Sequence, residues 1–547
     1  MAELILGPML RYVDATSATV WVETDAACQV EVLDHRASTF HVQGHHYAVV
    51  PVTALEPGCS AEYQVRLDGE LRWPLPDSPF PPSRIRTLPE HGAVRMVWGS
   101  CRVTAPHEHP YTLDEEQDPA GLGVDALEVL AQRLTQQDPS SWPALLLLLG
   151  DQVYADELSP QTMRYIESRR DAEGAAPPDE VLDFAEYTML YREAWSQDAI
   201  RWLFSIVPSA MIFDDHDVHD DWNTSEAWVE EMRATDWWSE RITAAIATYW
   251  IYQHLGNLAP SELVHDELYA KVLAADDAGP VLADFASAAD RDAGGRLWSF
   301  SRLIAGSRLV VVDGREGRVL SGDRRELIDD DQWKWLKQQV TGDYDHVLIA
   351  STIPVLLAPS LHYIEAWNEA ICSGAWGPSA AAAGERLRRA LDLEHWAAFQ
   401  DSFHRMVALI TEVASGRRGK APASVVMLGG DVHQGYLETV GFRRSAGVSS
   451  LVYQAVCSPF RNQLGRRERR LLRFTRRSRV ACWLAPRLAR SAGVRAPDVR
   501  WRVLQEPTWR NQLGWLVLDG RHLWLTIETT PGSSRHELKP TLEYQLA

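Results

Sequence analysis

Short apolar runs dominate the pattern of apolar and polar positions, and the most apolar of them covers residues 144–149. A short continuous apolar run predicts a strand that is buried on both faces. Gly150 follows it and permits a sharp turn, so Asp151 should stand at the carboxyl end of the strand, with Tyr154 nearby. Ligands of open α/β sheets bind at this end of the strands, which makes Asp151 a candidate functional residue.

Three further apolar runs end in the same way, in residues that can bind a metal ion. Residues 94–98 lead to Cys101, residues 210–213 lead to Asp214, Asp215 and His216, and residues 425–428 lead to Asp431 and His433. One such ending is common by chance, whereas four in one chain indicate strand ends that converge on a single metal centre.

The first 90 residues have a different pattern from the rest of the chain. Residues 19–24 and 28–33 alternate between apolar and polar positions, and Asp68-Gly69 is a typical hairpin-turn pair. These signals predict a small antiparallel β-sandwich domain over residues 1–90. From residue 91 onward strands alternate with helices, which predicts one α/β domain over residues 91–547.

Composition limits the class of protein and its partners. The chain has 547 residues, 46% of them hydrophobic, and a net charge of −21. An acidic protein is a poor candidate for general nucleic-acid binding. The six cysteines include no CxxC pair, which argues against a zinc ribbon. No signal peptide and no apolar run of membrane-spanning length is visible, so we expect no transmembrane segment and a cytoplasmic location.

Residues 466–495 depart from the acidic trend, because they hold eleven arginines and a single acid, Glu468. One interpretation is an amphipathic helix for a membrane surface or for acidic ligands. The other is a solvated helical face that pairs with acids elsewhere, and the acidic composition favours this second interpretation.

The candidate ligands divide into two chemical kinds. Asp151 fits a carboxylate that bridges two metal ions. Tyr154 would bind as phenolate, which only a strongly Lewis-acidic ion such as Fe(III) favours, and the Cys101 thiolate prefers a transition metal. His433 fits the same ion. Asp431 and the acids of residues 214–221 are hard ligands suited to Ca, Mg or Mn.

Each of these residues also has an ordinary structural interpretation. An isolated cysteine after a strand is usually a small core residue, and Gly-Asp after a strand is often only a turn. The cluster at 214–221 could be a solvated loop, but its five aspartates in eight positions repel each other unless cations screen them. Taken together, the four endings favour a metal site.

The motifs, in their order, resemble those of the PhoD-type alkaline phosphatases, within the calcineurin-like metallophosphoesterase superfamily. They are Gly99-Ser100-Cys101, Gly150-Asp151-Gln152-Val153-Tyr154, Phe213-Asp214-Asp215-His216, Asp313-Gly314-Arg315 and Gly430-Asp431-Val432-His433. The resemblance implies a layered αββα fold with an N-terminal β-sandwich of the fibronectin III type. It also implies Fe(III) at Cys101, Asp151, Tyr154 and His433, and calcium at Asp151, Asp431 and the loop after Asp215.

In that loop the family typically has two asparagines before an aromatic residue, whereas this chain has Asp220-Asp221 before Trp222. We therefore count Asp215 and Asp221 among the candidate ligands, and the additional carboxylate should favour a hard divalent ion such as Ca, Mn or Mg.

The resemblance and the two-metal chemistry predict a phosphoesterase that acts on monoesters, diesters or both. A metal-bound hydroxide would attack phosphorus in line with the leaving group. Arg102, Arg315 and Arg461 are candidates to clamp phosphate, with structural ion pairs as the alternative. His216 is the candidate proton donor. The other functions that remain open are a phosphodiesterase of the same superfamily and a metal-stabilised binding protein without catalysis.

Overall fold

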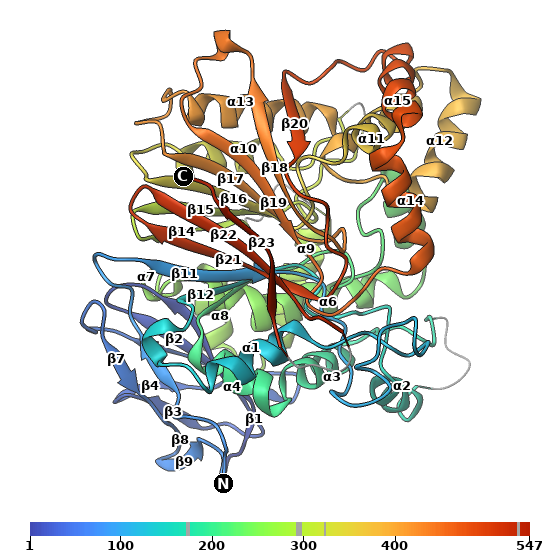
Figure 1. Ribbon diagram of the computed structural model, residues 1–547. Helices are drawn as coiled ribbons and strands as arrows, with labels where there is room; N and C mark the ends of the chain where they lie inside the picture. The colour runs from blue at the N-terminus through green and yellow to red at the C-terminus, as the bar shows by residue number, and fades with distance from the viewer. Residues whose placement is uncertain (171–175, 292–297, 322–323, 533–536) are drawn as a thin grey trace.

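The computed structural model describes residues 1–170, 176–291, 298–321, 324–532 and 537–547 (Figure 1). Its N-terminal part is all-β and antiparallel, as predicted. One sheet has the order β1-β2-β6-β5 (Leu4–Val13, Ala18–Thr24, His45–Val52 and Phe40–Val42), and a second has the order β4-β3-β8-β9 (His35–Ser38, Gln29–Val32, Val65–Leu67 and Glu70–Trp73). β7 (Ser60–Glu62) pairs with β10 (Arg84–Arg86).

The predicted turn at Asp68-Gly69 joins β8 to β9, and both residues have a positive φ, as the favoured hairpin turns require. Apolar residues of both N-terminal sheets share one core, which includes Val20, Val30 and Val65. The exact division of the chain at residue 90 stays a prediction.

Two larger sheets form the centre of the molecule (Figure 1). The six-stranded sheet is β13-β12-β11-β21-β22-β23, with strands Ser209–Ile212, Leu145–Leu149, Val94–Gly99, Gln512–Asp519, His522–Thr529 and Lys539–Gln545. The seven-stranded sheet is β14-β15-β16-β17-β19-β18-β20, with strands Phe300–Ile304, Ser307–Val312, His346–Ser351, Ser424–Gly429, Leu451–Cys457, Gly435–Phe442 and Val499–Val503. β11, β12 and β13 are parallel, as are β15, β16, β17 and β19, so the carboxyl ends of each set lie at one edge.

The α-helices of the described residues lie around the two sheets (Figure 1). They are α1 (Ala126–Leu134), α2 (Pro160–Glu167), α3 (Phe184–Trp195), α4 (Asp198–Ile206), α5 (Glu226–Arg233), α6 (Trp238–Tyr249), α7 (Pro260–Leu263), α8 (Glu267–Ala274), α9 (Gly279–Arg291), α10 (Asp330–Gln339), α11 (Pro359–Cys372), α12 (Pro378–Ala390), α13 (Gln400–Ala414), α14 (Arg466–Arg477) and α15 (Arg479–Ser491). A π-helical turn, η2 (Trp250–His254), extends α6.

Burial on both faces of the central strands gives the layered αββα arrangement. In β16, Leu348 and Ala350 belong to the core that the two sheets share, whereas Val347 and Ile349 belong to a second core beneath α10 and α13. The continuous apolar runs in the sequence therefore reflect strands with apolar neighbours on both sides.

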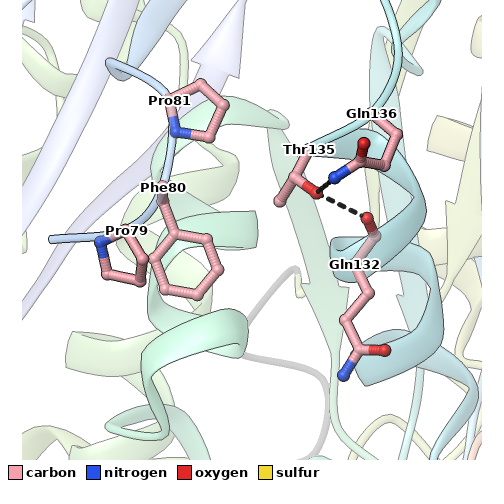
Figure 2. Close-up of a pocket in the computed structure, with 6 residues that line it drawn as sticks. All are labelled: Pro79, Phe80, Pro81, Gln132, Thr135 and Gln136. Atoms are coloured by element: carbon pink, nitrogen blue, oxygen red, sulfur yellow. Dashed lines mark hydrogen bonds between the residues drawn. The ribbon is translucent and has the colours of Figure 1, made fainter.

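The N-terminal part packs closely against the part that contains the two larger sheets. Phe80 stacks on Trp202 of α4 with ring centroids 5.2 Å apart, and the Trp202 indole donates to the carbonyl of Pro81. A hollow of about 620 Å³ lies beside this contact, between residues 79–81 and the end of α1 (Figure 2). Prolines, Phe80, Thr135 and two glutamines line it, so no charged side chain faces this hollow.

Among the described residues, no helix is both long and apolar enough to cross a lipid bilayer.

Candidate metal centre

Loops that follow four parallel strands meet at one place. The N–H of Cys101, after β11, donates to the carbonyl of Gly150, after β12 (3.3 Å). The N–H of Asp431, after β17 of the other sheet, donates to the hydroxyl of Ser100 (3.0 Å). The convergence that the apolar runs predict is therefore present, and it joins the two sheets at their carboxyl edges.

The approach of these loops depends on glycine at two positions. A Cβ on Gly150, which has φ +92°, would lie 2.5 Å from the Cβ of Asp214, and a Cβ on Gly430 would lie 2.6 Å from the Ser100 hydroxyl oxygen. Real Cβ atoms do not approach other atoms so closely, so a side chain at either position would force the loops apart.

Five predicted ligands have an unusual backbone conformation. The φ values are 56° for Cys101, 53° for Asp151, 63° for Asp221, 62° for Asp431 and 49° for His433. Non-glycine residues rarely adopt this left-handed region, and such strain concentrates at functional sites, where the surrounding structure holds it.

The carboxylates of Asp151, Asp215 and Asp431 form a compact cluster, in which one oxygen of each lies within 4.8 Å of the others. Oδ1 of Asp151 is buried and accepts no hydrogen bond from any described residue. Burial, and then the neighbouring aspartates, raise the pKa of Asp151 well above its usual range despite the opposing effect of His216. A metal ion would stabilise the ionised carboxylates, so the donor set fits a hard cation.

Cys101 and Tyr154 add a thiol and a phenol to this cluster. The Cys101 sulfur lies 3.2 Å from Oδ2 of Asp151 and within hydrogen-bond distance of the Ser100 and Ser458 hydroxyls. The Tyr154 hydroxyl accepts a hydrogen bond from the Asn462 amide (3.0 Å). Burial, followed by nearby acidic groups, raises the pKa of both side chains well above normal. A thiolate and a phenolate in this environment therefore require a strongly Lewis-acidic metal ion.

The two predicted histidines have opposite protonation preferences. Burial lowers the pKa of His433 to about 4, so its imidazole is neutral, as a metal ligand must be. For His216, burial acts to lower the pKa, but Asp156, whose carboxylate lies 2.9 Å from Nδ1, raises it well above normal. The His216 ring also lies beside that of Tyr154, with centroids 4.7 Å apart.

The three arginines proposed to clamp phosphate all bind protein groups instead. Arg102 forms a buried ion pair with Asp125 (2.8 Å) and also donates to the carbonyl of Ala194. Arg461 donates to the carbonyls of residues 105, 106 and 111. Each guanidinium is buried and turned toward the protein, which favours the structural alternative over the clamp for both residues.

Arg315 is also buried, but it lies directly beneath the carboxylate cluster. It pairs with Asp214, with Asp215 (3.1 Å) and with Glu394 (2.6 Å). Arg315 offsets part of the negative charge around Asp215. All three of its guanidinium nitrogens face these carboxylates, so none is left for a bidentate contact with phosphate.

A histidine that the sequence pattern did not single out holds Asp431. His395 lies between Glu365 (2.8 Å) and Oδ2 of Asp431 (3.3 Å). Burial opposes ionisation of Asp431, but His395 lowers the pKa of that carboxyl overall. Glu365 lies in α11 and His395 in the loop before a short 3-10 turn (Trp396–Ala398), far from any motif, so nothing in the local sequence could have identified them.

Asp217 is a further residue that the sequence did not distinguish from its acidic neighbours. It is buried, and its two oxygens accept hydrogen bonds from the N–H groups of Asp151, Gln152, Val153 and Asp214 and from the Gln253 amide. This carboxylate thus holds the loops that present Asp151 and Asp215.

Asp221 lies next to the cluster, and its N–H donates to Oδ2 of Asp215 (3.3 Å). Burial, and then Glu394, Asp220 and Asp392, raise its pKa to about 8. Its own oxygens are not among the three that form the compact cluster, so a role for Asp221 as a ligand stays a prediction.

A two-sheet α/β fold with carboxylates clustered at strand ends is typical of metal-dependent hydrolases. The chain belongs to the PhoD-like phosphatase family, whose sequence model matches residues 129–479. It is therefore a phosphoesterase of a metal-dependent family. Residues 1–85 match a domain of unknown function, DUF7800.

Solved structures agree with this assignment at the level of the fold. A structure described as "Structure of PhoD" matches with a TM-score of 0.60 at 13% identity, over 99% of this chain and 90% of that chain. GAP50, described as the anchor in the inner membrane complex of Plasmodium, matches with a TM-score of only 0.30 at 9% identity, over 83% of this chain and 88% of that chain, and supports no conclusion. No curated protein sequence matches significantly.

Proposed function

We propose that the chain hydrolyses phosphate monoesters and diesters with two unlike metal ions that share Asp151. Fe(III) would be held by Cys101, Asp151, Tyr154 and His433, and calcium, or Mn or Mg in its place, by Asp151, Asp215, Asp431 and Asp221. The observation that carries the proposal is the position of Asp151, whose carboxylate lies 3.2 Å from the Cys101 sulfur and in one cluster with Asp215 and Asp431.

The donor set supports two different ions better than two identical ones. The thiolate of Cys101 and the phenolate of Tyr154 suit a strongly Lewis-acidic transition metal. The carboxylates of Asp215 and Asp431 suit a hard divalent cation. When bound, the ions would activate water and stabilise the charge that develops on the phosphoryl oxygens.

His216 is the residue that we assign to proton delivery. Asp156 binds Nδ1 (2.9 Å) and so fixes the orientation of the ring, while Nε2 lies 3.9 Å from the Asp220 carboxylate, beyond hydrogen-bond distance. Nε2 would therefore donate to the departing oxygen. The side chain of His216 is about 20% exposed, so a leaving group can reach it from solvent.

Tyr154→Phe and Cys101→Ser test the Fe(III) assignment. A tyrosinate bound to Fe(III) gives a visible charge-transfer band, so Tyr154→Phe should abolish the colour of the purified protein and both variants should lower its iron content. Tyr544→Phe, at an exposed tyrosine of β23, is the matched control and should keep both. If colour and iron persist in both site variants, the iron assignment is wrong and a dinuclear Mn or Zn site replaces it.

Asp221→Asn tests the preference between substrates. The carboxylate adds negative charge close to the cluster and should repel a dianionic monoester more than a monoanionic diester, by roughly 1 kcal/mol in a partly screened site. We therefore expect Asp221→Asn to weaken the second metal and to shift the ratio of aryl monoester to aryl diester hydrolysis about fivefold toward the monoester. An unchanged ratio with unchanged metal affinity would contradict this role.

The same measurements separate catalysis from a pure binding role. A metal-loaded protein that hydrolyses neither class of ester would indicate the metal-stabilised binding protein instead. The cytoplasmic location stays a prediction.

A further inference from the structure

The arginine-rich segment folds into two consecutive helices, α14 and α15, at one edge of the molecule beside α11 and α12 (Figure 1). These helices carry an unusual amount of exposed apolar surface. Phe474, Val480, Trp483 and Leu484 are 64%, 65%, 55% and 49% exposed. Large exposed apolar side chains elsewhere in the described residues are scattered, whereas these four lie within eleven positions of the sequence.

The exposed apolar residues of α15 lie on one face. Val480, Trp483, Leu484 and Arg487 have the spacing of neighbours on a helix surface. The Arg487 guanidinium lies 3.9 Å from the centre of the Trp483 ring. Ala485 and Ala489, by contrast, are buried, and α15 packs on α11. The apolar face of α15 therefore points away from the protein.

Basic residues extend this face along α14. Arg467, Arg470 and Phe474 are exposed and lie three or four residues apart, which places them on one side of that helix. Arg466 and Arg469 pair with Glu116, as the solvated-face interpretation expects. Arg467, Arg470, Arg479 and Arg490 have no acidic partner within 4 Å among the residues that the structure describes, so their charge is available to a ligand.

We propose that α14 and α15 form a docking surface for an anionic lipid membrane. Arginines flanking exposed Trp, Phe, Leu and Val side chains are the combination that inserts into the interface of a bilayer with acidic headgroups. Trp and Phe enter the boundary between headgroups and acyl chains, while the arginines contact lipid phosphates. The chain is strongly acidic as a whole, so this basic surface differs in charge from the rest of the molecule. It would attract an anionic partner that the rest of the molecule repels.

Lipid fits this surface better than the other anionic or apolar partners. A long nucleic acid would have to approach a protein of net charge −21, and Val480 and Leu484 offer it neither a charge nor a ring for stacking. A second copy of the chain would bring the unpaired arginines of both surfaces together, which is unfavourable.

The docking surface is joined to the metal centre through a short stretch of chain. Asn462, which donates to the Tyr154 hydroxyl, lies only four residues before the start of α14. Binding of α14 to a membrane would therefore hold the metal centre close to that membrane.

Co-sedimentation of the full-length protein with vesicles tests the proposal. We expect binding to vesicles of phosphatidylcholine mixed with phosphatidylglycerol, little binding to phosphatidylcholine alone, and weaker binding as salt rises. Arg467→Gln combined with Arg470→Gln should weaken binding about 30-fold, and Trp483→Ala on the order of tenfold.

Two matched controls distinguish this surface from the rest of the molecule. Arg417→Gln combined with Arg444→Gln removes two exposed arginines that lie outside α14 and α15. Trp524→Ala removes an exposed tryptophan of β22. Both controls should bind vesicles like the wild type. All variants should hydrolyse a soluble aryl phosphoester at the wild-type rate, which shows that they are folded and that a failure of docking is separate from a failure of the proposed function.

Two results would overturn the proposal: no binding to the acidic vesicles, or binding that the helix variants leave unchanged. In the first case, a dimer in solution that Trp483→Ala dissociates would identify a second copy of the chain as the partner. Retention on single-stranded DNA that the arginine variant abolishes would identify a nucleic acid instead.

Discussion

At the scale of single residues, Asp217 shows how a buried carboxylate can serve a metal site without binding the metal. It accepts hydrogen bonds from backbone N–H groups on both sides of the site, including those of Asp151 and Asp214 (2.9 Å each). Burial raises its pKa to about 7 even though these donors act to lower it. The residue is thus held in place by the loops that it orients.

Asp217→Asn should weaken metal binding. Both carboxylate oxygens of Asp217 accept hydrogen bonds from backbone N–H groups, whereas asparagine has a single oxygen, so its NH₂ group would face N–H donors. Changes of this kind behind metal ligands typically cost 10–100-fold in metal affinity, and the lost hydrogen bonds should lower the free energy of unfolding by about 2 kcal/mol. Metal retained after dialysis against a chelator measures the first effect. Asp329→Asn, at a buried N-cap of α10, should keep its metal, and equal retention in both variants would refute the role of Asp217.

At the scale of secondary-structure elements, the apolar runs predicted the strands that carry the site, because β11, β12, β13, β15, β16 and β17 are buried on both faces. The motifs after these strands lie on loops that meet in the structure, because parallel strands place their carboxyl ends at one edge of a sheet. The partners of the ligands could not be found in this way. Glu365 comes from α11 and His395 from a loop, and the local sequence pattern of both is ordinary. The structural contacts of Arg102, Arg315 and Arg461 are made with residues distant in sequence, so they could not be predicted either.

The π-helical turn η2 gives the N-terminal part of the chain a connection to the site. Arg11 of β1 is buried and donates to the carbonyls of Ser209 in β13 (3.1 Å), Tyr252 (2.5 Å) and Gln253 (2.6 Å). A π-helical turn displaces backbone carbonyls from their usual partners, and Arg11 satisfies two of them. Gln253 in turn donates to Asp217 (3.0 Å).

Arg11→Met should lower the free energy of unfolding by about 3 kcal/mol, because it leaves three carbonyls without a donor in a buried place. Denaturant unfolding of the full chain measures the change. Arg66→Met, at a less buried arginine of β8 that donates to a turn carbonyl, should change stability by less than about 0.5 kcal/mol. Equal losses for the two variants would show that η2 does not depend on Arg11.

At the scale of the whole molecule, two sheets bring together predicted ligands that lie far apart in the sequence. Cys101, Asp151 and Asp215 follow strands of the six-stranded sheet, whereas Asp431 and His433 follow β17 of the seven-stranded sheet. The site therefore exists only when both sheets are packed, and an ion held between them should stabilise the folded chain as a ligand of the native state.

The central claim is that Asp151 holds metal ions on which hydrolysis depends, and elemental analysis of Asp151→Asn tests it most directly. Wild type, Asp151→Asn and the exposed control Asp331→Asn would be purified alike, and metal content and hydrolysis of aryl phosphoesters measured on the same samples. We expect Asp151→Asn to lose both ions and at least about a hundredfold in rate, since metal ions supply several kcal/mol of transition-state stabilisation, while Asp331→Asn matches the wild type. An Asp151→Asn protein with full metal content and wild-type hydrolysis would contradict the claim.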